Sequence, residues 1–196
     1  MKARRATQHR QTRETDIAVS LNLDGTGRCR IATGMPFLDH MLELFGRHAL
    51  VDLDIRARGD LPVDFHHTVE DLGLVLGTCL DKALGDRKGI RRYGWCLLPM
   101  DESLSQVALD LGGRPFLVYA VANRTRRIRD FDVRLIEEFF RALAVQTRMN
   151  LHIRQLYGDE AHHAYESVFK GFARALRQAV ERDPRERGVP SSKGKI

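Results

Sequence analysis

An internal repeat constrains what this chain can fold into more than any other feature of its sequence. The first copy runs from about Pro36 to Asp86, and the second runs from about Val133 to Asp183. Each copy has the pattern of an amphipathic helix, a strand, a polar turn and a second helix that opens on a His-His pair. Because both copies encode the same succession of elements, the repeat predicts two halves of similar structure.

Apolar patterning predicts strands inside the copies and before them. The expected strands cover residues 16–23, 29–33, 51–56, 96–100, 103–111, 116–121 and 150–155. These elements favour an α/β fold of the α+β type, internally duplicated, in which each half is a sheet with helices on one face. The first half with its N-terminal strands is expected over residues 1–92 and the second over 93–183, in one compact domain. Residues 184–196, rich in Pro, Gly, Ser and Lys, are expected to form an extended arm, with simple disorder as the alternative.

The composition excludes several classes of protein. Hydrophobic residues make up 43% and charged residues 30% of the 196, which is typical of a soluble globular protein. The longest apolar runs are too short to cross a bilayer, and no apolar segment follows the charged N-terminus to form a secretory signal. Three widely spaced cysteines without a CxxC motif favour neither a disulfide framework nor a thiolate zinc site, and they are typical of the reducing cytoplasm.

The net charge of +6 indicates an anionic partner. The basic residues are dispersed, with local groups at 124–129 and 182–187, and aromatic residues make up 7% without interleaving among the basic ones. A base-stacking surface for nucleic acid is therefore not favoured. A phosphate-bearing small molecule explains the scattered Arg and Lys better.

Two HHxxE motifs carry the candidate chemistry; they begin at His66 and His162 and end at Glu70 and Glu166. On a helix, residues four apart lie on one face, so the first His and the Glu of each motif can share a metal ion. The second His projects about 100° away, as the 3.6-residue period requires. Each motif therefore offers ligands in two directions, and two motifs from duplicated halves can enclose two ions.

A further candidate ligand precedes each motif. His40 lies 26 residues before His66 (66 − 40), Glu138 lies 24 before His162 (162 − 138), and the difference of two falls in the turn. His40 and Glu138 are therefore equivalent positions of the repeat. Imidazole and carboxylate ligands without sulfur favour Mn²⁺, Fe²⁺ or Zn²⁺ over Ca²⁺ or Mg²⁺. One motif alone would fit a solvated helix start equally well, and a structural metal is a second alternative, but two matched copies favour a site for chemistry.

At these residues the sequence resembles imidazoleglycerol-phosphate dehydratase. The matching stretches run in order along nearly the whole chain, at residues 13–15, 36–41, 59–60, 64–71, 89–90 with Arg92, 109–111 with 113–115, 151–152, 162–163 and 190–194. The resemblance implies a duplicated α/β fold, two Mn²⁺ ions per active site at subunit contacts, and a symmetric homo-oligomer of 24 subunits.

The resemblance implies dehydration of D-erythro-imidazoleglycerol phosphate to imidazole-acetol phosphate in histidine biosynthesis. The carbon that must lose a proton is not next to a carbonyl, so it is not acidic. Two metal ions on the ring nitrogens can hold the ring as an imidazolate, whose electrons help to expel the neighbouring hydroxyl before a protein base removes the proton. The implied metal ligands are His40, His66, His67, Glu70, Glu138, His162, His163 and Glu166. Many family members have His where this chain has Glu138, and carboxylate oxygen can replace imidazole on Mn²⁺.

The same resemblance implies further roles. Glu14, Asp101 and Glu166 are the candidate acid/base groups, with Glu102 as the alternative to Asp101. The implied substrate contacts are Glu14, His40, His48, His66, Arg92, Arg114, His162, Lys170, Ser191, Ser192 and Lys193. The Arg and Lys side chains among them suit a phosphate dianion. Taken alone, each of these charged residues would more simply be explained as a solvated surface residue.

Two other functions would explain part of these observations. A nucleic-acid-binding protein would use the basic residues at 124–129, would bind DNA or RNA in a salt-sensitive way, and would not need the His pairs. A two-metal hydrolase of phosphate esters would share the metal ligands but not the arm residues at 191–193. Formation of a ketone instead of free phosphate separates the dehydratase from the hydrolase.

Overall fold

The chain folds into two halves that contain the same elements in the same order. The computed structural model describes residues 3–122, 124–194 and 196. The first half consists of β1 (Arg5–Gln11), β2 (Thr15–Asn22), β3 (Cys29–Ala32), α1 (Pro36–Ala49), β4 (Asp52–Gly59) and α2 (His66–Leu84). The second consists of β5 (Tyr93–Met100), β6 (Ser103–Asp110), β7 (Phe116–Ala120), β8 (Arg127–Ile128), β9 (Phe131–Asp132), α3 (Leu135–Thr147), β10 (Asn150–Tyr157) and α4 (Ala161–Val180). The second half differs by the short β8–β9 hairpin before α3.

The two sheets have one topology. The strand orders are β1-β2-β4-β3 and β5-β6-β10-β7. In each sheet the first three strands pair antiparallel, and the fourth pairs parallel to its neighbour. This correspondence, strand for strand, confirms the predicted duplication and the predicted fold class.

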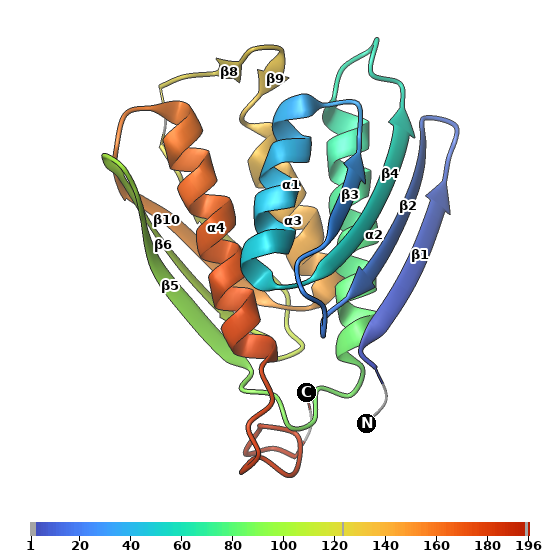
Figure 1. The fold of residues 1–196 in the computed structure, drawn as a ribbon, viewed down its shortest axis with the longest axis vertical. Coiled ribbons are helices and arrows are strands. Elements are labelled where there is room, and N and C mark those ends of the chain that lie inside the picture. Colours follow the sequence, from blue (N-terminus) through green and yellow to red (C-terminus); the bar gives the residue numbers. More distant parts are fainter. Residues whose placement is uncertain (1–2, 123, 195) are drawn as a thin grey trace.

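The helices fill the space between the two sheets (Figure 1). Strand residues alternate between the faces, so that Val19 of β2 and Ile55 of β4 are opposite each other and fully buried beneath the helices. The helices pair across the halves, because α1 packs against α4 and α2 packs against α3. The rings of Phe45 in α1 and Phe172 in α4, for example, stack at 5.3 Å. Apolar residues of both halves therefore share one core.

Two glycines allow neighbouring backbones to approach each other unusually closely. A Cβ at Gly73 of α2 would lie 2.6 Å from the carbonyl oxygen of Phe139 in α3. A Cβ at Gly94 of β5 would lie 1.9 Å from the carbonyl oxygen of Ala175 in α4. These backbones approach each other where a side chain would separate them, which sets the positions of α2 and α4, the helices that carry the His pairs.

The strands inside the repeats form within a few residues of the predicted bounds, and the structure adds three others. β1 lacks apolar alternation because it is an edge strand whose side chains are mostly exposed. β8 and β9 contain two residues each, which is too short for a periodic signal. Over the described ranges, no helix has the length and apolar character needed to cross a membrane.

Candidate metal centre

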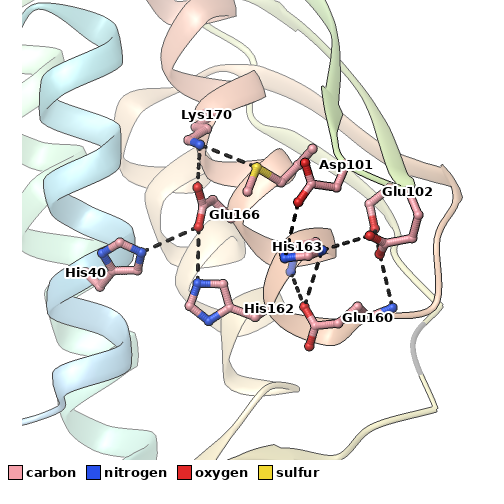
Figure 2. Close-up of polar contacts among 10 residues, drawn as sticks. His40, Asp101, Glu102, Glu160, His162, His163, Glu166 and Lys170 are labelled. Atoms are coloured by element: carbon pink, nitrogen blue, oxygen red, sulfur yellow. Dashed lines mark hydrogen bonds and ion pairs between the residues drawn. The ribbon is translucent and has the colours of Figure 1, made fainter.

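Three predicted ligands converge from two helices of different halves. His40 lies in the first turns of α1, and His162 and Glu166 lie in the first turns of α4 (Figure 2). Nε2 of His162 is 3.1 Å from Oε2 of Glu166, and Nε2 of His40 is 3.5 Å from the same oxygen. The two imidazole side chains are 43% and 41% exposed, whereas the Glu166 side chain is only 10% exposed. A buried carboxylate thus has two accessible imidazoles beside it.

The donor atoms of this cluster fit a metal ion. One ligand atom from each of His40, His162 and Glu166 lies within 4.8 Å of the others. Two ligands each roughly 2.1 Å from one ion are about 3–4 Å apart, so small side-chain rotations bring the three atoms into range. The set contains nitrogen and oxygen but no sulfur, which suits Mn²⁺, Fe²⁺ or Zn²⁺. The cluster can therefore hold one side of a metal site and leave positions open.

Lys170 lies beside the cluster, one turn after Glu166. Its Nζ contacts the second carboxylate oxygen of Glu166 and lies 3.6 Å from the sulfur of Met100. Burial raises the pKa of Glu166, but the hydrogen bonds and charges of Lys170 and His40 outweigh this, so the net shift is downward. Glu166 is therefore held ionised, which suits a metal ligand better than a proton donor.

Two of the repeat-equivalent residues, His66 and Glu138, line one cavity. Nε2 of His66 lies 3.7 Å from Oε2 of Glu70 within α2. Glu138 of α3 and His66 both line a cavity of about 580 Å³ whose wall includes the β8–β9 hairpin residues Arg127 and Asp132. Glu138 also lies 3.7 Å from Arg141 in its own helix. His66 of the first half and Glu138 of the second thus share one cavity, just as His40 of the first half and His162 of the second share one cluster.

The second His of each motif points away from the first. The ring of His163 is directed toward Asp101, Glu102 and Glu160 in Figure 2. Its Nδ1 is 2.8 Å from Oε2 of Glu102, and its Nε2 is 3.7 Å from Oδ2 of Asp101. The hydrogen bond with Glu102 is the main cause of the raised pKa of His163.

His67 has a matching environment in the first half. Its Nδ1 is 3.0 Å from Oδ2 of Asp60 and 3.9 Å from Oε2 of Glu14. The hydrogen bond with Asp60 is the main cause of the raised pKa of His67. From the sequence, Asp60 has no predicted role beyond its place in the resemblance. Its position just before the helix that carries the His pair was the available signal.

The remaining predicted site residues form a separate group. Arg92 pairs with Asp110 at 2.6 Å and donates to the carbonyl of Pro190 at 2.7 Å, so the arm lies against it. Its backbone N–H donates to Ala179, near the end of α4. Since a helix rises 1.5 Å per residue, this point is roughly 25 Å along α4 from His162. Ser191, Ser192 and Lys193 belong to the arm, and Arg114 lies in the connection from β6 to β7; Ser191 is half-buried and the other three are exposed. We call these four residues and Arg92 the Arg92 group.

His48 lies at the end of α1, near Lys170 and Arg174 of α4. Burial lowers its pKa, and the nearby positive charges of Lys170 and Arg174 lower it further. One chain therefore brings together the first-motif residues with Glu14 and the second-motif residues with Asp101 and Lys170. It does not bring the Arg92 group to either of them.

Comparison with known proteins identifies one family. A family model described as imidazoleglycerol-phosphate dehydratase matches residues 33–176. The protein of that name from Geobacter metallireducens is 55% identical, with 99% of this chain and 100% of the relative covered. The one from Methylorubrum populi is 57% identical, with 98% and 100% covered.

Solved structures give the same result. The dehydratase from Staphylococcus aureus has a TM-score of 0.83 and 37% identity, with 91% of this chain and 99% of that chain covered. The one from Pyrococcus furiosus, solved in complex with (S)-C348, has a TM-score of 0.83 and 36% identity, with 96% and 100% covered. This chain belongs to the imidazoleglycerol-phosphate dehydratase family.

Proposed function

We propose that this chain dehydrates D-erythro-imidazoleglycerol phosphate to imidazole-acetol phosphate, with two Mn²⁺ ions, as a step of histidine biosynthesis. The observation that carries the proposal is the convergence of His40, His162 and Glu166, which come from different halves of the chain and whose ligand atoms lie within 4.8 Å of one another. Relatives that match the chain from end to end are named for this reaction. The free state of the three cysteines suits a reducing compartment, and we place the enzyme in the cytoplasm.

The proposed ligands divide into inward and outward sets. His40, His162 and Glu166 would hold one ion, and His66 and Glu138 with Glu70 would contribute to the other. His67 and His163 point outward and would complete sites with ligands from a neighbouring subunit. Bound Mn²⁺ would supply a Lewis acid that stabilises negative charge on the substrate's imidazole ring.

The carboxylates of the two hairpin turns would act as the acid and the base. Glu14 lies between β1 and β2 beside His67, and Asp101 lies between β5 and β6 beside His163. Both carboxylates are more than half exposed, at 56% and 71%, so they can reach a substrate bound next to the histidines. One would protonate the departing hydroxyl and the other would remove the proton from the adjacent carbon. Loss of water leaves an enol, which tautomerises to the ketone.

The phosphate group would be held by the Arg92 group of another subunit. A cation set with an adjoining Ser-rich arm suits a phosphate dianion, but in one chain it lies roughly 25 Å along α4 from His162. The outer face of the second sheet supports assembly, because it exposes large apolar side chains, namely Tyr93, Trp95, Leu97, Phe116 and Val118. We therefore propose a homo-oligomer of 24 subunits, with active sites at the contacts between them.

Metal-dependent turnover tests the function. The purified protein would be stripped of metal, titrated with Mn²⁺, and assayed for the ketone product and for free phosphate. Ketone formation that requires Mn²⁺ is expected, with loss of turnover and of bound metal in His67→Ala and His163→Ala. Full turnover after complete chelation, or release of inorganic phosphate in place of ketone, would rule the proposal out.

Subunit mixing tests the shared site. Lys193→Ala removes an arm cation, and His162→Asn removes a metal ligand, so each variant alone is expected to be nearly inactive. If one site draws on two subunits, refolding the two variants together restores activity, because some sites then combine intact residues from both chains. No restoration in a mixed assembly would show that both residues serve the site of one chain.

A further inference from the structure

The second His of each motif has a carboxylate on the same ring nitrogen. Nδ1 of His67 is 3.0 Å from Oδ2 of Asp60, and Nδ1 of His163 is 2.8 Å from Oε2 of Glu102. An ionised carboxylate can only accept a hydrogen bond, so Nδ1 must carry the hydrogen and donate it. In the neutral ring, the lone pair is then on Nε2. Both contacts therefore select the same tautomer, in which Nε2 is available to a cation.

These two carboxylates do not occupy equivalent positions of the repeat. Asp60 lies in the connection from β4 to α2, whereas Glu102 lies in the turn from β5 to β6. Each half also has an acid in the other of these two connections, but farther away. Oε2 of Glu14 in the β1–β2 turn is 3.9 Å from Nδ1 of His67, and Oε2 of Glu160 in the β10–α4 connection is 3.8 Å from Nδ1 of His163. The near and the far partner are thus exchanged between the halves.

This exchange argues against a contact retained only because the chain was duplicated. A copied contact would come from the same position in both halves, but here the position differs and the short contact at Nδ1 is what recurs. The contact that Nε2 of His163 makes with Oδ2 of Asp101, at 3.7 Å, is too long for a hydrogen bond. The side chains of His67 and His163 are 38% and 30% exposed, so their rings are accessible at the surface.

We propose that Asp60 and Glu102 are positioning residues that fix the tautomer and ring orientation of His67 and His163, so that Nε2 of each ring is presented to a cation. The inference rests on the proposed function, which supplies the Mn²⁺. A carboxylate behind a ligating imidazole raises its basicity and holds its ring, and loss of such a partner typically weakens metal binding about 10- to 100-fold.

Mn²⁺ affinity of the full chain, measured by equilibrium dialysis on metal-stripped protein, tests the inference without reference to turnover. Asp60→Ala and Glu102→Ala are each expected to weaken Mn²⁺ binding about 10- to 100-fold. Asp60→Asn and Glu102→Gln keep an acceptor oxygen for Nδ1 and are expected to keep most of the affinity. The matched control is Asp16→Ala, which removes a carboxylate 2.6 Å from Nε2 of the exposed His9, an imidazole that belongs to neither motif, and should leave Mn²⁺ binding unchanged.

Unfolding of the metal-free variants by urea separates positioning from a structural role. For the alanine variants we expect unchanged unfolding midpoints together with weakened Mn²⁺ binding. Normal Mn²⁺ affinity in both alanine variants would overturn it, and so would lowered midpoints with unchanged affinity of the folded protein. A wild-type protein that binds no Mn²⁺ would instead refute the proposed function, and this inference with it.

Discussion

Replacement of Arg87 by Met is the sharpest test of how the two halves are joined. Arg87 follows α2 and is only 2% exposed. Its guanidinium donates to the carbonyls of Leu111 at 2.8 Å and Thr147 at 2.5 Å, both in the second half, and to the carboxylate of Asp81 at 2.5 Å. Met retains most of the aliphatic volume but none of the donors, so the change isolates the polar contacts.

The structure sets the size of the expected effect. Each lost hydrogen bond from a charged donor to a buried carbonyl costs about 1.5–3 kcal/mol. Asp81 keeps an ion-pair partner in the variant, because Arg148 also lies 2.9 Å from it. Breaking a buried ion pair on one side typically costs about 3–5 kcal/mol, and we expect a loss of unfolding free energy in this range for Arg87→Met. For a chain of this size, that corresponds to a melting temperature lower by about 6–20 °C.

Urea unfolding of the metal-free protein, followed by circular dichroism, measures the loss. The matched control is Arg91→Met, because Arg91 is 48% exposed and pairs with Glu181 at 3.2 Å on the surface. That variant should differ from wild type by less than about 1 kcal/mol. A loss below about 1 kcal/mol for Arg87→Met as well would refute the reasoning, since it would mean that the buried carbonyls do not need their donor.

Three further changes probe the cluster, the pH response and the packing. Glu166→Gln keeps the size of the side chain but removes the negative charge of this proposed metal ligand, so bound Mn²⁺ and turnover should both fall sharply. A normal metal content by elemental analysis would contradict this. The hydrogen bond from Arg134 lowers the pKa of Asp132 from 3.8 to about 2, so its stabilisation is present above pH 4 and is lost as the pH falls toward 2. The unfolding free energies of wild type and Asp132→Asn, which we expect to differ by less than about 1 kcal/mol at neutral pH, should therefore converge over that window, and a gap that stays constant would exclude the pair as its source. Gly94→Ala places a Cβ 1.9 Å from the Ala175 carbonyl oxygen, so thermal unfolding should show a loss of about 1–3 kcal/mol or more, and an unchanged midpoint would disprove the close approach.

Much of the fold follows from local patterns in the sequence. The repeat, the helical spacing after each His pair and the alternation in β2 and β6 predict the duplicated halves, because periodicity records which face of an element is apolar. α2 begins at His66, and α4 begins one residue before His162, so the motif Glu residues lie one turn into their helices, as their spacing predicts. Periodicity does not predict β1, because an exposed edge strand buries too little side-chain surface to need apolar alternation.

Tertiary structure alone decides which faces meet. The repeat makes His40 and Glu138 equivalent, but it does not reveal that α1 packs against α4 of the other half, which places His40 beside Glu166. Nor does it reveal that Asp60 and Glu102, from positions that are not equivalent, reach the same nitrogen of the second His in each motif. The physical reason is that periodicity is a property of neighbouring residues, whereas these contacts depend on the close packing of segments that lie far apart in the chain.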